Sequence, residues 1–178
     1  YVALNVGYSF GLKHVVILDV FLIAAGFMLR ILAGTLGIGI APSQWLLLTG
    51  LLLTLFLGFA KRRAELSALQ EDSGTHRRVL EHYSEPLLDQ MITVAAAGVI
   101  VAYALYTVSP DSFFHDAAAT LIYTLPFVLY GMFRYLYLLH RRGGGGEPAL
   151  EIVRDPHLVA AGAGWLGLTL WLLVNPVL

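Results

Sequence analysis

The sequence contains no cysteine, which excludes disulfides, thiolate catalysis and cysteine-ligated zinc or iron–sulfur sites. Charged residues are also scarce, at 13% of the 178 residues, whereas soluble domains average about 25%. The formal net charge is −1, so the chain lacks the excess of Lys and Arg that neutralises nucleic-acid phosphates. We therefore expect neither an ordinary soluble domain nor a nucleic-acid partner.

Apolar residues are abundant instead, at 58% of the chain with a mean hydropathy of +0.74. The stretch from Ile31 to Ala60 carries no charge at all. About 20 apolar residues are enough for a helix to cross the hydrocarbon core of a membrane. The sequence therefore predicts an all-α, polytopic transmembrane bundle. The expected spans are residues 15–36, 43–60, 89–108, 117–138 and 157–176.

The remaining segments complete the predicted organisation. Residues 1–12 have the composition of the end of an earlier helix, and residues 61–88 are expected to form a cytoplasmic loop. The sequence opens at Tyr1 without the features of a signal peptide. We therefore expect the 178 residues to be the C-terminal part of a single, longer transmembrane domain.

The basic residues predict how the bundle is oriented. Every Lys and Arg except Arg30 lies before the first span, between the second and third, or in the segment that runs from the end of the fourth span to the start of the fifth. Positive charges are retained on the cytoplasmic side of a membrane. We therefore expect these segments to face the cytoplasm, in the cell (inner) membrane, and Arg30 to reach towards the outer interface.

Asp19 is a carboxylate inside a predicted span, roughly 9 Å along the helix from Lys13. Ionisable groups at membrane depth are costly, and they are kept mainly where they are paired or functional. Two interpretations remain open. Asp19 either forms a hydrogen bond or ion pair between helices, or it binds a substrate or a metal.

Lys61 and Glu65 begin the most highly charged segment of the chain. Their i,i+4 spacing places them on one face if the second span continues as a helix. Such a face presents a cation to an anion and a carboxylate to a metal or a hydroxyl; the alternative is a topogenic basic cluster with an incidental ion pair. No phosphate-binding glycine loop, HExxH metal pair or GxSxG elbow occurs, and the six histidines lack ligand spacing.

Several short motifs follow one another in a recognisable order. They are Tyr8-Ser9-Phe10-Gly11-Leu12-Lys13, Asp19, Phe27-Met28-Leu29-Arg30, Ala33-Gly34, Trp45, Lys61-Arg62-Arg63-Ala64-Glu65-Leu66, Arg77, Leu80, Tyr83, Arg134-Tyr135, Glu147-Pro148 and Arg154-Asp155. In this order the chain resembles the C-terminal part of the UbiA superfamily of intramembrane prenyltransferases. The resemblance implies a UbiA-like helix bundle with a polar cavity that opens to the cytoplasm and a lateral opening for a lipid.

One departure from the superfamily pattern narrows the implied function. Most members carry an Asp-x-x-x-Asp motif where this chain has the segment from Lys61 to Glu65. The departure favours the phosphoribosyl branch of the superfamily. That branch transfers 5-phosphoribose from phosphoribosyl pyrophosphate to a polyprenyl phosphate, here a decaprenyl phosphate, and releases pyrophosphate in the synthesis of cell-wall arabinan precursors.

The resemblance also implies roles for individual residues, because two phosphate-bearing substrates need cations around them. The resemblance implies catalytic roles for Lys13, Asp19, Lys61 and Glu65. It implies substrate contacts for Tyr8, Lys13, Lys61, Arg62, Arg77, Tyr83 and Arg154. Mg²⁺ is the implied cofactor, with Glu65 as a candidate ligand beside aspartates of a first aspartate-rich motif that these residues lack. The chain by itself is therefore expected to be inactive, and homo-oligomerisation is left open.

We expect Lys13, Asp19, Lys61, Arg62 and Glu65 to converge on one cavity facing the cytoplasm. A short helix over residues 75–84 is expected to cover it as a lid. Two other functions remain as alternatives. One is transfer of a prenyl group from a prenyl diphosphate to an aromatic or other acceptor, and the other is a non-catalytic membrane module.

Overall fold

The computed structural model of the chain describes residues 10–12, 15–37, 39, 42–71, 82–109, 118–141 and 148–175. Helices account for the regular structure of these residues, and no strand occurs among them. The all-α prediction is confirmed. The long helices are α2 (Leu18–Gly37), α3 (Gln44–Glu71), α4 (Glu85–Val108), α6 (Leu125–Arg141) and α8 (Pro156–Val174). The short ones are α5 (Ala118–Leu121), η4 (Ile122–Thr124) and α7 (Pro148–Arg154).

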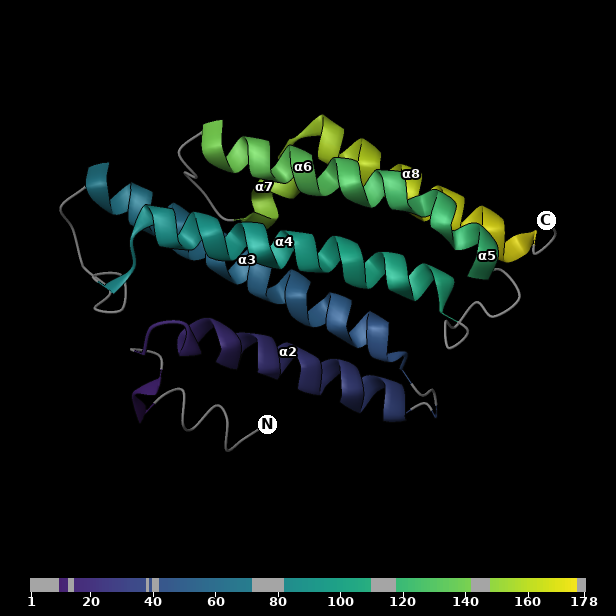
Figure 1. The fold of residues 1–178 in the computed structure, drawn as a ribbon, viewed down its shortest axis with the longest axis horizontal. Helices are drawn as coiled ribbons and strands as arrows, with labels where there is room; N and C mark the ends of the chain where they lie inside the picture. The colour runs from purple at the N-terminus through teal and green to yellow at the C-terminus, as the bar shows by residue number, and fades with distance from the viewer. Residues whose placement is uncertain are drawn as a thin grey trace.

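The long helices lie in three rows (Figure 1). α3 and α4 form the middle row and share the most extensive helix contact, α2 packs on α3, and α6 pairs with α8 on the other side. The short helix α7 contacts both α3 and α8. We call the end of the bundle where α2 and α4 begin and α3 and α6 end the basic end, because the described arginines other than Arg30 lie towards it.

Five helices of the described chain are long and apolar enough to cross a membrane. They are Leu18–Gly37, Gln44–Ala68, Glu85–Val108, Ile122–Arg141 and Pro156–Val174. The chain is therefore a multi-pass membrane protein. Large apolar side chains such as Val94 and Leu170 are exposed on the surface of the bundle, which suits a helix that faces lipid.

Close approach between the helices depends on glycines. A Cβ atom added at Gly58 would lie 2.5 Å from Cγ1 of Val20, and one added at Gly98 would lie 3.0 Å from Cδ1 of Leu52. Gly58 thus lets α3 approach α2, and Gly98 lets α4 approach α3. Small residues at crossings are the usual means by which membrane helices pack closely.

Two of the long helices begin at defined caps. Ser84 caps α4 and accepts a hydrogen bond from the amide of Leu87. Asp155 caps α8 and accepts from the amides of His157 and Leu158. Each cap is followed by a proline in the first helical turn, where the missing N–H costs nothing.

The helix bounds differ from the expected ones mainly after residue 60. The segment 61–71, expected to belong to a loop, continues α3 as helix to Glu71. Ala, Leu, Glu, Lys and Arg dominate this segment and are strong helix formers. α4 in turn begins at Glu85. Residues 75–81 of the expected lid over residues 75–84 lie outside the described residues. Most of the helix end expected over residues 1–12 also lies outside them.

Candidate functional site at the basic end

Four polar side chains meet where α2 begins beside the last turns of α3. Asp19 comes from the first turn of α2, Arg62 and Glu65 come from α3, and Tyr83 immediately precedes the cap of α4. We call these four residues the Arg62 cluster. These side chains meet because α3 continues as a helix beyond Ala60 and runs antiparallel to α2 (Figure 1).

The guanidinium of Arg62 lies between two carboxylates. Its Nε donates to Oδ2 of Asp19 at 2.7 Å, and its Nη1 donates to Oε2 of Glu65 at 2.5 Å. Asp19 is fully buried and the Arg62 side chain is 4% exposed, whereas the Glu65 side chain is 28% exposed. Glu65 is therefore the carboxylate of the cluster that solvent can reach.

Tyr83 completes the hydrogen bonding of Asp19. Its hydroxyl donates to Oδ1 of Asp19 at 3.0 Å and accepts from the amide of Ile17 at 2.6 Å. Burial raises the pKa of Tyr83 to about 12, and the negative charge of Asp19 adds to the rise. Tyr83 is consequently a neutral hydrogen-bond donor at physiological pH. The interhelical ion pair, one of the two interpretations left open for Asp19, is present; the substrate or metal role stays a prediction.

A second ionic group lies on the neighbouring face of α3. The guanidinium of Arg63 pairs with Glu85 and Asp89, each at 3.1 Å, and it donates to the hydroxyl of Ser67. Nε2 of His140 on α6 lies 3.8 Å from Asp89. Arg63 thus ties the end of α3 to the start of α4. The sequence analysis did not predict this pairing, and the i,i+4 spacing of Glu85 and Asp89 is the signal that could have indicated it.

A third ionic group joins α6 to the start of α8. Arg134 holds Asp155 with two hydrogen bonds, Nε to Oδ1 at 3.2 Å and Nη2 to Oδ2 at 2.8 Å. These bonds lower the pKa of Asp155 to about 2, and the amides that Asp155 caps contribute to the shift. Arg134 and Asp155 both belong to motifs of the resemblance, but their pairing was not visible in the sequence.

The two other described residues with expected substrate contacts are exposed. Lys61 precedes Arg62 on α3, about 100° around the helix, and its side chain is exposed. Arg154 is the last residue of α7 and is also exposed. Of the five residues expected to converge on one cavity, Asp19, Arg62 and Glu65 contact one another, and the cavity facing the cytoplasm stays a prediction. Three other expected site residues lie outside the described residues: Tyr8, Lys13 and Arg77.

An apolar cavity of about 260 Å³ lies between α3, α6, α7 and α8. Its lining is aliphatic and aromatic and includes Leu57, Phe127, Met132, Ile152 and Trp165. Leu57 lies one helical turn before Lys61 on α3. Ile152 lies close to Arg154 on α7. Two of the lining residues are therefore followed in the sequence by an exposed cation. Lys61 comes four residues after Leu57, and Arg154 comes two residues after Ile152.

The described residues offer little to a metal ion. No group of three or more His, Cys, Asp or Glu side chains suited to a metal occurs in the described part of the chain. Both oxygens of Asp19 already accept hydrogen bonds in the interior, from Arg62 and from Tyr83. Glu65 fits as a single ligand, because Mg²⁺ bound with a phosphate substrate often uses only one or two carboxylates.

Three relatives found by comparison with known proteins carry the same name. The chain is 34% identical over 93% of its length to the decaprenyl-phosphate phosphoribosyltransferase of Corynebacterium glutamicum and covers 50% of that protein. It is 31% identical over 94% of its length to the enzyme of that name from Mycolicibacterium smegmatis, covering 54% of it. The corresponding values for the Mycobacterium tuberculosis protein are 28%, 93% and 54%.

No family model matches the chain. The chain spans about half the length of the curated relatives it matches. Its similarity to them nevertheless extends over nearly all of its own residues and includes the segment that contributes Lys61, Arg62 and Glu65. Over nearly all of its own residues, the chain is therefore similar to about half of each of these decaprenyl-phosphate phosphoribosyltransferases.

Proposed function

We propose that the protein containing this chain transfers 5-phosphoribose from phosphoribosyl pyrophosphate to a polyprenyl phosphate, such as decaprenyl phosphate. The observation that carries the proposal is the homology to proteins named for this activity over more than nine-tenths of the chain. The cationic segment around Lys61 supports it, since both substrates are anions. By the same analogy, the product serves the synthesis of cell-wall arabinan precursors.

In the proposed reaction, the bond between the anomeric carbon of ribose and the pyrophosphate oxygen breaks, and pyrophosphate leaves with the electron pair. An oxygen of the lipid phosphate forms the new bond to that carbon. The lipid phosphate is already anionic at neutral pH, so the step needs no strong general base. Its main requirement is to hold two anions close together.

The exposed side chains of Lys61 and Arg154 are suited to that requirement. Charge-assisted hydrogen bonds from Lys or Arg to phosphate are about twice as strong as neutral ones. Lys61 would bind a phosphate group, and Glu65, one turn further along α3, would orient a ribose hydroxyl. Arg62, buried between two carboxylates, would hold Glu65 in place and not contact a phosphate.

The apolar cavity behind Lys61 supports a lipid acceptor. A polyisoprenoid chain has no polar group beyond its phosphate, and burying it against Leu57, Ile152 and Trp165 would be favourable. The phosphate would then lie near Lys61 or Arg154. The cavity thus matches the apolar part of the acceptor, and the nearby cations match its charged head.

Mg²⁺ is the cofactor that we propose, because it neutralises charge on a leaving pyrophosphate. Glu65 is the described residue that would ligate it. The basic end would face the cytoplasm at the cell membrane, because positively charged residues are retained on that side. Phosphoribosyl pyrophosphate, a water-soluble substrate, would reach the site from that side.

The test uses the full-length protein in detergent or lipid nanodiscs. We expect it to convert labelled phosphoribosyl pyrophosphate and decaprenyl phosphate into a lipid-linked product, with loss of turnover on addition of EDTA. Lys61→Ala and Glu65→Ala should each lower turnover at least about 100-fold, the usual cost of losing an electrostatic catalytic contact.

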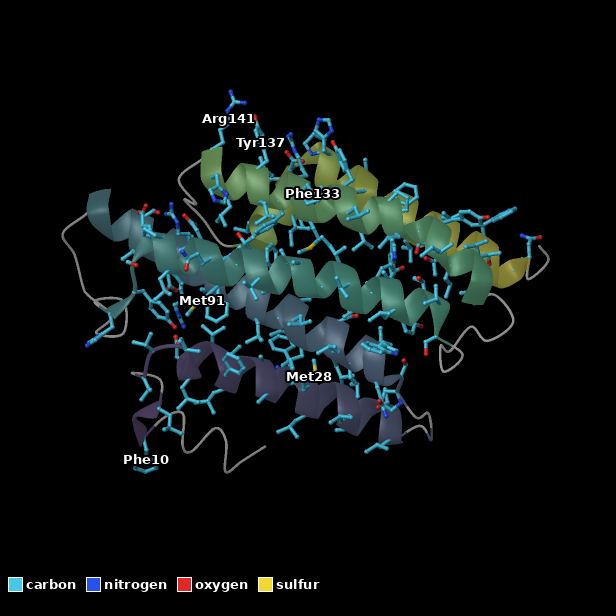
Figure 2. All side chains as sticks on the ribbon, viewed as in Figure 1. Phe10, Met28, Met91, Phe133, Tyr137 and Arg141 are labelled. Atoms are coloured by element: carbon cyan, nitrogen blue, oxygen red, sulfur yellow. The ribbon has the colours of Figure 1, made fainter. Side chains whose placement is uncertain are left out.

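Arg141→Ala is the matched control. Arg141 is also a basic residue at the basic end, but it projects outward from α6 beside Tyr137 (Figure 2). Its removal should leave turnover unchanged. Transfer of a prenyl group from a prenyl diphosphate to an aromatic acceptor, with no reaction of phosphoribosyl pyrophosphate, would overturn the proposal in favour of a prenyltransferase. Activity with neither donor would favour a non-catalytic module.

A further inference from the structure

Tyr83 and Asp19 are both buried at the basic end of the bundle. Asp19 is 0% exposed and Tyr83 is 6% exposed. Each oxygen of Asp19 already accepts a hydrogen bond, and the hydroxyl of Tyr83 both donates and accepts. Any influence of these residues on the reaction must therefore pass through the groups that they hold.

Those groups form a continuous chain of contacts that leads to the accessible carboxylate. Tyr83 donates to Asp19, Asp19 accepts from Arg62, and Arg62 donates to Glu65. The chain links three separate segments: the start of α2, the end of α3 and the residues before α4. From Asp19 onwards the exposure of the side chains rises, from 0% at Asp19 through 4% at Arg62 to 28% at Glu65.

A strained turn lies at the other end of the same chain of contacts. Ile17, the residue before α2, has a φ of +70°, which β-branched residues rarely adopt. Such a conformation persists only where its surroundings hold it. The hydroxyl of Tyr83 accepts the Ile17 amide, and the Ile17 carbonyl accepts from the amide of Phe21 at 3.1 Å.

We propose that Tyr83 and Asp19 are positioning residues that fix Arg62, and through it Glu65, relative to the turn before α2. The proposal rests on the proposed function, in which Glu65 orients the ribosyl donor. In this proposal Tyr83 acts on the substrate indirectly, through Asp19, Arg62 and Glu65, and not by the direct contact expected from the sequence. A buried tyrosine that stays neutral can hold this arrangement over the whole physiological pH range.

The test is Tyr83→Phe in the full-length protein. Phenylalanine keeps the buried ring and removes only the hydroxyl. We expect the KM for phosphoribosyl pyrophosphate to rise about tenfold, comparable to the loss of one hydrogen bond to a charged group. The KM for the polyprenyl phosphate should stay unchanged, because the apolar cavity is untouched. Asp19→Asn keeps the size of the side chain and should also raise the KM for the donor.

Tyr103→Phe is the matched control. Tyr103 is 6% exposed, as Tyr83 is. Its hydroxyl also has two partners, Oγ1 of Thr124 at 2.6 Å and Nε1 of Trp165 at 2.7 Å. It lies in the half of the bundle away from the basic end. Tyr103→Phe should lower the thermal stability about as much as Tyr83→Phe does and leave the KM for phosphoribosyl pyrophosphate unchanged.

The outcomes separate the two proposals. Normal wild-type kinetics with an unchanged donor KM in Tyr83→Phe would overturn the positioning role alone. An equal rise of the donor KM in Tyr103→Phe would also overturn it, because the effect would then come from general loosening of the bundle. Wild-type protein that transfers no phosphoribose would overturn the proposed function and the positioning role together.

Discussion

Tyr83 and Tyr103 hold the two halves of the bundle in different ways. Both are 6% exposed, and both hydroxyls have two hydrogen-bonding partners. Around Tyr103 every partner is neutral, and the hydrogen bonds join α4 to η4 and α8. Around Tyr83 the partners include Asp19, which in turn holds Arg62.

The difference shows that a buried charge is not needed to join these helices. Hydrogen bonds between neutral groups connect membrane helices at about 0.6 kcal/mol each on average. A buried ion pair must also offset several kcal/mol of desolvation per ion, and apolar residues often replace such a pair without loss. The buried pair of Asp19 and Arg62 therefore needs an explanation beyond packing, and the proposed positioning of Glu65 would supply one.

The largest expected effect is that of Arg62→Leu. The substitution leaves Asp19 charged and buried with Tyr83 as a donor, and breaking one side of a buried ion pair costs about 3–5 kcal/mol. We expect the free energy of unfolding in detergent to fall by that amount. Tyr103→Phe should cost about 1 kcal/mol in the same assay.

The double variant Asp19→Asn with Arg62→Leu sharpens this comparison. It removes both charges, so it should regain most of the stability lost in Arg62→Leu while activity stays low. Equal destabilisation by Arg62→Leu and Tyr103→Phe would contradict the distinction between the charged and the neutral network.

An intermediate effect is expected at Gly58, one turn before Arg62 on α3. The Cβ atom of Gly58→Ala would meet Val20 at 2.5 Å and push α2 away from α3. Overpacking of this kind costs about 1–3 kcal/mol. Because the shift also separates Asp19 from Arg62, we expect both the thermal stability and the affinity for the donor to fall.

Gly26→Ala is the control, since a Cβ atom at Gly26 meets no atom within 4 Å. It should leave both the melting temperature and the donor KM near wild-type values. A Gly58→Ala protein with wild-type donor KM would show that the cluster tolerates displacement of α2.

The smallest effect near neutral pH is expected at Asp155. Its pKa is lowered to about 2 from an ordinary value of 3.8. Because its pKa is lower in the folded protein, ionised Asp155 stabilises the fold, and this stabilisation is fully present above about pH 4. It is lost as the pH falls through the folded-state pKa of about 2. The contribution should therefore be constant from pH 8 to about pH 5. Melting temperatures from pH 7 down to pH 3 measure it.

Asp155→Asn provides the reference for that titration, because asparagine keeps a capping oxygen but cannot ionise. The fall in melting temperature between pH 4 and pH 3 should be smaller in Asp155→Asn than in wild type. An identical fall in both proteins would assign the acid sensitivity to other carboxylates.

The sequence predicted the helices better than it predicted their contacts. The five spans followed from the length of the apolar runs, and residues 15–29 together with the charge-free stretch from Ile31 to Ala60 were long enough for two of them. The end of α3 was placed too early, at residue 60. Charge was read there as the end of a span, although Lys, Arg and Glu continue a helix as readily as apolar residues do.

At the candidate site, the sequence identified residue types and left their geometry open. Asp19 and Glu65 were selected as unusual carboxylates, and Lys61 and Arg62 as part of a distinctive basic motif. The sequence did not indicate that Arg62 would turn inward and Lys61 outward. That choice depends on which face of α3 packs against α2.

What the sequence determined by itself is local along the chain: apolar runs long enough to span a membrane, and basic segments that alternate with them. The tertiary structure decided the pairings. Asp19 and Arg62 are 43 positions apart, and they meet only because Gly58 lets α3 approach Val20 of α2. The physical reason is that hydropathy acts on each segment separately, whereas an ion pair requires two helices at a specific distance and rotation.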